Sequence, residues 1–514
     1  MKFSRSSGIL LHPTSLSGPF GIGDLGPEAY TFADFLTASE QSIWQVLPLG
    51  PTGYGDSPYA CYSAFAGNTL LISPEVLIED GVLLRGDIPN HHSFEREDQI
   101  DFEAVHKSKA SLLLKAFTRF KAATHHRLAE QFTQFTQRCS SWLEDYALFQ
   151  ALKDAHGGVA WIDWEPGIVR REPRALARAR QNLSEQIEAQ KFYQFLFFRQ
   201  WFALKAYCNE RGIRLVGDIP IFVAEDSADV WTNPDQFKLD RDGRPLVVAG
   251  VPPDYFSATG QLWGNPLYDW DRMLADGFKW WLERVSATLQ TVDIVRIDHF
   301  RGFVACWEIP AGDKTAERGR WVPAPGRELF ARIKEVLGEL PIIAEDLGVI
   351  TPDVEALRDS FGFPGMRILQ FAFSSDTRNV DLPHNYHRNS VVYTGTHDND
   401  TIVGWFKSVA GAGSTRTPAQ IERERNFCLK YLYSDGTEIE WDFIRTVLAS
   451  VADTAVIPLQ DLLGLGSNAR MNLPNTTAGN WIWRVKPNAL TERHATRLRE
   501  LTEVYGRSLA PVTL

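Results

Sequence analysis

The sequence is poor in cysteine, and no pattern would join the cysteines it has. The five lie at positions 61, 139, 208, 306 and 428, and none belongs to a Cys-x-x-Cys pair. An odd and scattered set is typical of reduced thiols and argues against both a disulfide framework and a cysteine zinc site. We therefore expect free thiols.

Long apolar runs are also missing. No segment approaches the roughly 18 consecutive apolar residues that a membrane span requires. Residues 9–11 are apolar, but His12 and Pro13 end this run before it reaches the length of a signal-peptide core. We therefore expect a cytoplasmic protein with no membrane partner.

An excess of positive charge is absent as well. The formal net charge is −11 at pH 7, whereas binding to a nucleic-acid backbone needs clustered lysine and arginine. The arginine-rich stretch 170–174 is interrupted by Glu172 and Pro173, which is typical of a solvated surface segment. We expect no nucleic-acid partner.

The remaining composition is that of a globular protein rich in aromatic residues. Of 514 residues, 44% are hydrophobic and 23% are charged, and there are 16 Trp, 14 Tyr and 31 Phe. These proportions are typical of a folded chain. Aromatic rings offer large flat apolar surfaces on which sugar rings can stack, although core packing accounts for most of them.

Eight short apolar segments end in polar, glycine-marked or proline-marked turns, and segments with helical spacing lie between them. The eight lie at residues 8–11, 42–47, 214–219, 293–297, 341–344, 366–371, 391–394 and 455–459. Strands that alternate with helices predict a parallel sheet. Eight such units predict an α/β fold of the (β/α)8 TIM-barrel type, whose active site lies at the carboxyl ends of the strands.

The spacing between these strands is uneven, which predicts insertions. Segments 111–120 and 142–152 carry apolar residues at helical spacing, and a later stretch is dense in glycine, proline and aromatic residues, which is typical of functional loops. About fifty residues follow the last strand, too few for a separate C-terminal β domain. The predicted organisation is a first part of the barrel at 1–72, a mainly helical inserted subdomain at 73–191, and the remainder of the barrel at 192–514, with a second insertion at about 224–290 that carries substrate-binding loops.

Three strand ends carry carboxylates that could act together, namely Asp298, Glu345 and Asp398. On a barrel their side chains can converge on one pocket. Several like charges in one cleft push their pKa values apart, so that one carboxyl stays protonated as an acid while another stays ionised as a nucleophile. Glycosidic-bond chemistry has this requirement.

The residues alone leave alternatives open at these strand ends. Strand alternation puts Arg296 and Asp298 on one face, where the cation favours an ionised carboxylate that can act as a nucleophile. The same two residues could instead form a structural ion pair. Asp346 could be the reactive group in place of Glu345.

A metal site is a further alternative, because His299, His397 and Asp398 could be ligands in a barrel hydrolase. The histidines at these strand ends, however, form no His-x-His or His-x-x-x-His pair. We expect neither a metal nor an organic cofactor.

These three motifs resemble the shared regions of the α-amylase clan. The flanking segments narrow the resemblance to the amylomaltase, or 4-α-glucanotransferase (disproportionating enzyme), family. The supporting stretches lie at residues 11–16, 44–59, 217–223, 250–256, 260–268 and 470–474. The resemblance covers nearly the whole barrel portion and is least specific in the helical insertion.

The resemblance implies an enzyme that transfers α-1,4-glucan segments between maltodextrins by a retaining double displacement through a covalent glycosyl-enzyme. It makes Asp298 the nucleophile, Glu345 the general acid/base and Asp398 the carboxylate that holds substrate hydroxyls. Donor and acceptor would be α-1,4-glucans such as maltose, maltodextrins, starch or glycogen.

The same resemblance implies a set of substrate-binding residues around the three carboxylates. To favour a sugar acceptor over water, such a site must exclude water and present the acceptor hydroxyl in line. The implied residues are Arg296, His397, Tyr59, Asp218, Asp254, Tyr255, Phe256, Gln261, Trp263 and Asn472, with Tyr54 in a more distant glucan groove. Two other functions stay open: an α-glucan hydrolase of the same clan, and a glucan-binding protein without catalysis.

Overall fold

The computed structural model describes residues 4–88, 96–122, 126–253, 259–409, 416–474 and 476–508. Three residues of the implied substrate-binding set, Asp254, Tyr255 and Phe256, lie outside the described residues.

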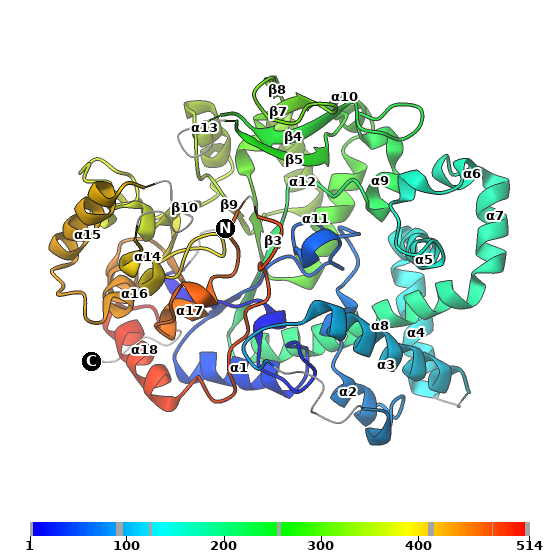
Figure 1. The fold of residues 1–514 in the computed structure, drawn as a ribbon, viewed down its shortest axis with the longest axis horizontal. Coiled ribbons are helices and arrows are strands. Elements are labelled where there is room, and N and C mark those ends of the chain that lie inside the picture. Colours follow the sequence, from blue (N-terminus) through cyan, green and yellow to red (C-terminus); the bar gives the residue numbers. More distant parts are fainter. Residues whose placement is uncertain are drawn as a thin grey trace.

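Eight parallel strands close into a barrel at the centre of the molecule (Figure 1). Around the barrel the order is β1-β12-β11-β10-β9-β6-β3-β2, so each strand lies beside the next barrel strand of the chain and the last closes on the first. The strands are β1 (Ser6–Leu10), β2 (Ile43–Gln45), β3 (Arg214–Ile219), β6 (Ile294–Ile297), β9 (Ile342–Ala344), β10 (Gly365–Ile368), β11 (Ser390–Tyr393) and β12 (Thr454–Pro458). Each overlaps one predicted segment, and the predicted TIM-barrel fold is confirmed.

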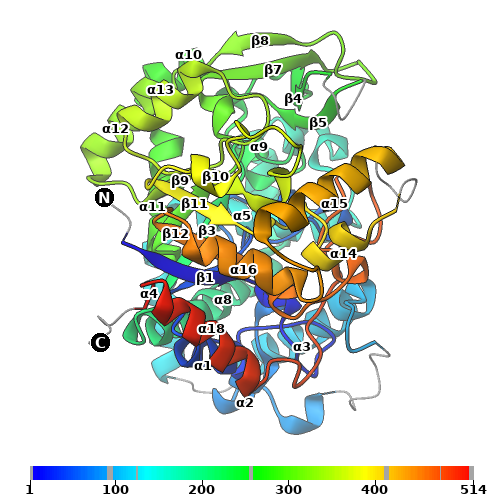
Figure 2. The same cartoon turned by 90° about the vertical axis from the view of Figure 1, so that its left-hand side faces the viewer.

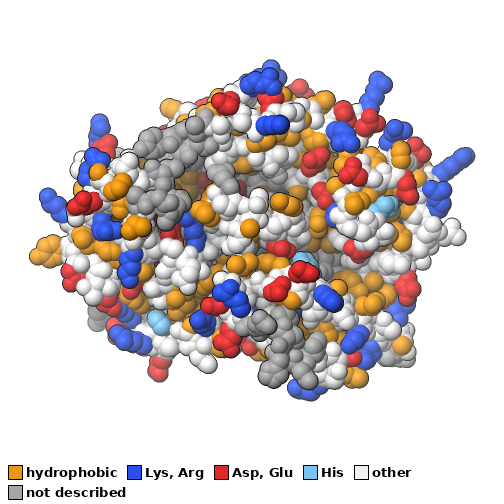
Figure 3. All heavy atoms as spheres, viewed as in Figure 1, with side chains coloured by type: hydrophobic (Ala, Val, Ile, Leu, Met, Phe, Trp, Pro, Cys, Tyr) orange, Lys and Arg blue, Asp and Glu red, His pale blue; other side chains and the backbone are white. Residues whose placement is uncertain are grey.

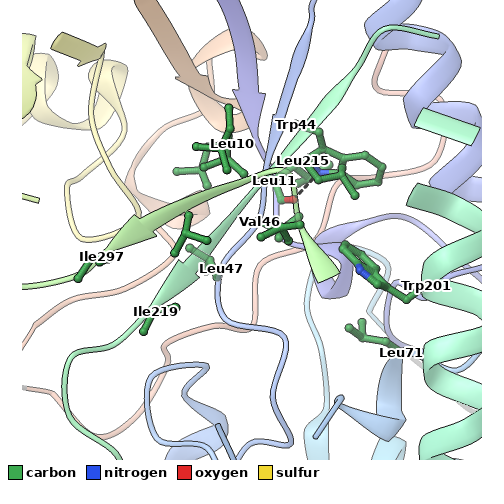
Figure 4. Packing of buried hydrophobic residues seen from close by; sticks show 14 of the residues in the cluster. Leu10, Leu11, Trp44, Val46, Leu47, Leu71, Trp201, Leu215, Ile219 and Ile297 are labelled. Atoms are coloured by element: carbon green, nitrogen blue, oxygen red, sulfur yellow. Dashed lines mark hydrogen bonds between the residues drawn. The ribbon is translucent and has the colours of Figure 1, made fainter. Parts of the chain in front are cut away.

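The strands form here because their side chains are buried on both faces, as expected for a parallel barrel covered by helices. Apolar side chains of neighbouring strands, among them Leu215, Ile219 and Ile297, pack together in the interior (Figure 4). The Trp44 indole N–H donates to the backbone oxygen of Leu11 at 2.8 Å, which satisfies a polar group that would otherwise be buried alone.

Helices cover the outside of the barrel. They include α1 (Pro27–Ala38), α11 (Lys279–Thr291), α12 (Gly326–Leu337), α13 (Pro352–Ser360), α16 (Ile439–Ala449) and α18 (Glu492–Val504). The last of them contacts α1 and α16, so helices from the two ends of the described chain lie side by side (Figure 2). None of the described helices combines the length and the apolar character that crossing a bilayer requires.

Arg507, just after α18, ties this last helix to the barrel. Its guanidinium is buried and donates to six backbone oxygens, including those of Ser6 at 2.8 Å, Leu448 at 2.7 Å and Ala452 at 2.9 Å. Arg5 also donates to three of these oxygens, and a hydrogen bond to a charged group contributes about 1.5–3 kcal/mol.

We therefore expect Arg507→Ala to lower the free energy of unfolding by about 3–5 kcal/mol, as measured by denaturant titration. The matched control is Arg499→Ala on α18, whose side chain is 44% exposed and lies 4.0 Å from Glu503. An exposed pair of this kind contributes about 0–1 kcal/mol. Equal effects of the two substitutions would contradict the buried role of Arg507.

The chain between β2 and β3 forms helices that pack beside the barrel (Figure 1, blue through cyan to blue-green). They are α2 (Pro74–Glu79), α3 (Phe102–Ala122), α4 (His126–Arg138), α5 (Ser140–Ala155), α6 (Pro166–Val169), α7 (Pro173–Asn182) and α8 (Ser184–Glu210). Helix α8 contacts α3, α4, α5 and α7, and it leads directly into β3. One continuous cluster of buried apolar residues joins these helices to the barrel. The bounds 73–191 stay a prediction.

A second, antiparallel sheet of order β5-β4-β7-β8 lies above the barrel (Figure 1). Its strands are β4 (Val247–Val251), β5 (Gln261–Pro266), β7 (Ala305–Pro310) and β8 (Arg320–Pro323), with α9 (Ala228–Thr232) and α10 (Trp270–Ala275) nearby in the chain. This sheet was not predicted from the sequence, which suggested only loops at 224–290. Two of its strands precede the barrel strand β6 and two follow it, so no local hairpin pattern reveals the whole sheet.

Candidate active site

The three predicted carboxylates all lie at the carboxyl ends of barrel strands. Asp298 follows β6, Glu345 follows β9, and Asp398 lies in the loop after β11. Strands β6 and β9 are neighbours in the barrel. The closed barrel therefore brings together residues that are up to a hundred positions apart in the sequence.

Arg296 lies between two carboxylates that differ in their exposure to solvent, Asp218 and Asp298. Its Nη1 donates to Asp218 Oδ2 at 2.5 Å, and its Nη2 donates to Asp298 Oδ1 at 2.9 Å. The Asp218 side chain is fully buried, whereas that of Asp298 is 31% exposed. Burial raises the pKa of Asp218, and the charge of Arg296 opposes this rise. Asp218 is thus the structural partner of the arginine, while Asp298 stays accessible from the strand end.

Glu345 is held beside Asp298 by the backbone N–H of His299, the residue that follows Asp298. The His299 N–H donates to Glu345 Oε2 at 2.6 Å, and the Leu347 N–H donates to Oε1 at 3.1 Å. Burial and the negative charge of Asp298 raise the pKa of Glu345 to about 8, against the lowering effect of Arg296 and the two N–H groups. A carboxyl with this pKa is protonated at neutral pH and can act as a general acid.

Asp346, the alternative to Glu345, has a different environment. It is buried, its side chain pairs with Arg358 on α13, and its Oδ1 accepts the Met366 N–H at 2.7 Å. These bonds join the barrel end to an outer helix. The geometry therefore favours Glu345 as the reacting carboxyl and a structural role for Asp346.

The two histidines of the metal alternative contact aromatic rings. His299 has left-handed backbone geometry with φ of 50°, and its ring meets Trp263 edge-to-face at 4.8 Å. Burial lowers the pKa of His299 to about 4, so its ring is neutral. His397 stacks on Tyr59 with ring centroids 5.0 Å apart. Among the described residues, no group of three or more His, Cys, Asp and Glu side chains is placed to hold a metal.

Asp398 is the most exposed of the three carboxylates, and residues of the segment 470–472 hold it in place. Asn472 Nδ2 donates to its Oδ1 at 2.6 Å, and Arg470 Nη2 donates to its backbone oxygen at 2.6 Å. The His397 Nε2 lies 3.4 Å from the same Oδ1. Asn472, which the resemblance placed among the substrate-binding residues, thus contacts the carboxylate that would hold the substrate.

Aromatic residues lie near the carboxylates in two places, around Tyr59 and around Trp263. Tyr59 donates its hydroxyl to Asp218 Oδ2 at 2.8 Å, and Trp481 lies 5.9 Å from the rings of both Tyr59 and His397. At the start of β5, the Trp263 indole N–H donates to Gln261 Oε1 at 3.1 Å.

Tyr54 lies in the 3-10 turn Tyr54–Asp56, and the residue is 80% exposed. Its place in a more distant glucan groove stays a prediction. Trp481 and Arg470 were not singled out from the sequence; Arg470 lies in a stretch that carried the resemblance, whereas no sequence signal marks Trp481.

A TIM barrel with an accessible Asp beside a protonated Glu, and a third carboxylate after another barrel strand at the same end of the barrel, defines an enzyme that acts on glycosidic bonds. The model of glycoside hydrolase family 77, described as 4-alpha-glucanotransferase, matches residues 11–491. The chain belongs to this family, and its activity is that of a 4-alpha-glucanotransferase. The resemblance found in the sequence is confirmed.

Similar proteins extend over almost the whole chain. The 4-alpha-glucanotransferase of Synechocystis sp. is 52% identical over 509 residues, 98% of each chain. That of Thermus thermophilus is 51% identical over 515 residues, 99% of this chain and all of that one. Among solved structures, the amylomaltase from Streptococcus agalactiae in complex with acarbose has a TM-score of 0.93 and 44% identity, and the match covers 98% of this chain and 100% of that one.

Proposed function

We propose that this enzyme moves α-1,4-glucan segments from one maltodextrin to another in two displacements at Asp298. The observation that carries this mechanism is the arrangement of Asp298 and Glu345. Asp298 is accessible and accepts a hydrogen bond from Arg296. Glu345 is protonated and accepts the backbone N–H of His299, the residue after Asp298.

In the first displacement, Asp298 attacks the anomeric carbon of the donor while Glu345 gives its proton to the departing glycosidic oxygen. The bond from that carbon to the leaving sugar breaks, and a glycosyl ester of Asp298 forms. In the second displacement, ionised Glu345 takes the proton of an acceptor 4-hydroxyl, whose oxygen attacks the same carbon and releases Asp298. Two inversions retain the α configuration.

The surrounding residues support this chemistry in different ways. Arg296 donates to Asp298 Oδ1 and thereby holds this carboxylate in place at the strand end. Asp398, oriented by Asn472, would accept hydrogen bonds from sugar hydroxyls that strengthen as the ring distorts. Tyr59, Trp263 and Gln261 would contact the sugars and limit the access of water to the glycosyl ester.

We further propose that both donor and acceptor are α-1,4-glucans, such as maltose and maltodextrins, and that the protein acts in the cytoplasm. The related amylomaltase from Streptococcus agalactiae is in complex with acarbose, which supports a glucan site. The five cysteines are free thiols, which supports a reducing compartment.

Incubation of the purified enzyme with maltotriose tests the transfer. Longer oligosaccharides together with glucose are the expected products, resolved by chromatography. Shorter sugars alone would mean that water is the acceptor, and an unchanged substrate would leave only binding.

The raised pKa of Glu345 predicts a pH dependence of catalysis. The first displacement needs the protonated acid, so kcat/KM for maltotriose should fall about tenfold per pH unit above about pH 8, where Glu345 loses its proton. Initial rates from pH 6 to 10 measure this limb. With an α-maltosyl fluoride donor, whose leaving group needs no proton, the fall in the glycosylation rate should disappear. A limb that persists with the fluoride donor would assign the titration to another group.

A further inference from the structure

One buried carboxyl group fixes both ends of the loop that carries His397 and Asp398. Asp461 lies in α17 (Leu459–Leu462), directly after β12. Its Oδ2 accepts the Thr394 hydroxyl at 2.6 Å, and its Oδ1 accepts the Ile402 N–H at 2.8 Å. Thr394 is the first residue after β11, and Ile402 begins α14 (Ile402–Lys407). The whole loop 395–401 lies between these two bonds.

The setting of Asp461 is one in which a carboxyl group is unfavourable. Its residue is 2% exposed. Burial raises its pKa to about 7, and the charges of Asp400 and Glu440 add to this, while the two hydrogen bonds lower it. An apolar side chain would be buried here without this penalty. The cost of burying a carboxyl at this position is therefore offset by the two hydrogen bonds that Asp461 makes.

The middle of the loop is held by the segment that follows α17. Ser467 donates to Asp400 Oδ2 at 2.7 Å, and Arg470 and Asn472 hold Asp398 as described above. Behind the loop lies a cavity of about 30 Å³ lined in part by His12, His397 and Asp461. A space of this size admits about one water molecule. Hydrogen bonds from the segment after α17 thus hold the middle of the loop.

We propose that Asp461 is a positioning residue, which places Asp398 for glucan transfer by tying together the two ends of loop 395–401. It acts through the loop, as Thr394 and Ile402 take up both of its oxygens. This inference rests on the role of Asp398 proposed above.

The test compares Asp461→Ala with Asp461→Asn in maltotriose disproportionation, at a temperature where circular dichroism shows each variant folded. Asp461→Ala should lower kcat about 100-fold, the effect of a small displacement of a reacting group, with little change in KM. Asp461→Asn should recover most of the activity. Its Oδ1 accepts the Ile402 N–H, and its Nδ2 donates to the Thr394 hydroxyl, which can accept.

Thr394→Val provides a second variant if Asp461→Ala does not fold. It removes one of the two bonds while keeping the branched shape, and it should lower kcat about tenfold without changing KM. Asp293→Ala is the matched control. The Asp293 carboxylate accepts the Leu215 backbone N–H at 2.8 Å and the Asn209 side-chain amide at 2.9 Å. It thus also links a backbone group to a side chain, but at the opposite end of the barrel. Asp293→Ala should lower stability and leave kcat unchanged.

Full kcat in folded Asp461→Ala, or equal losses in Asp461→Ala and Asp461→Asn, would overturn the proposal. Asp398→Asn is measured beside them, so that the role of Asp398 and the positioning role of Asp461 are tested separately. If Asp398→Asn retains turnover, the role of Asp398 is itself wrong and the positioning role fails with it. If Asp398→Asn is inactive while Asp461→Ala and Thr394→Val keep full kcat, only the positioning role fails.

Discussion

Asp298→Asn should lower the rate of glucan transfer from maltotriose by on the order of 10⁴-fold, the scale seen when a residue of a catalytic unit is removed. The amide is nearly isosteric, and Arg296 keeps its bond to Asp218 at 2.5 Å, so the strand end should keep its shape. The loss should extend to α-maltosyl fluoride, because an amide oxygen is a poor nucleophile whatever the leaving group. Steady-state rates with both donors measure it.

Asp293→Asn is the control for this variant. It changes the same residue type close to the other end of β6, where the side chain bonds Leu215 and Asn209, and it should leave both rates intact. Turnover of the fluoride donor by Asp298→Asn at the native rate would contradict the assignment of Asp298 as the nucleophile.

Glu345→Gln should lower transfer from maltotriose by about 10²–10⁴-fold, the usual contribution of general acid–base catalysis, yet should still be glycosylated by α-maltosyl fluoride. Fluoride leaves without a proton, so the first displacement can proceed. The second displacement lacks its base, and the glycosyl ester on Asp298 should accumulate. Fluoride release should therefore show a burst of one equivalent per enzyme, and intact-protein mass should rise by one maltosyl unit.

Asp346→Asn distinguishes the two adjacent carboxylates. Asp346 pairs with Arg358 and accepts the Met366 N–H, so its substitution should reduce stability and show no burst. A burst in Asp346→Asn, with normal turnover in Glu345→Gln, would exchange the two roles.

The barrel and the three carboxylates could be predicted from the sequence because both leave local signals. Each strand is a short apolar run that ends in a turn, and Asp298, Glu345 and Asp398 follow directly or within a few residues. The choice between Glu345 and Asp346 had no local signal. It depends on Arg358, a dozen positions further on, which draws Asp346 toward the outer helix.

Residues that act through tertiary contacts could not be predicted in the same way. Asp461 follows a predicted strand just as the other carboxylates do, but only the closed barrel shows that it reaches Thr394 and Ile402. Trp481 joins the Tyr59 and His397 rings from a segment without regular secondary structure. Charges of both signs are interspersed over the face shown in Figure 3.

The pairing of β4 with β7 limits how this enzyme can be recombined with its relatives. Trp307 of β7 lies opposite Gly250 of β4, and the barrel strand β6 runs between these two strands in the chain. A chimera with a breakpoint between β4 and β7 would join two halves of a sheet from different parents, next to Gln261 and Trp263. An exchange meant to transplant acceptor preference should therefore extend from before β4 to beyond β8, and it will carry the strand of Asp298 with it.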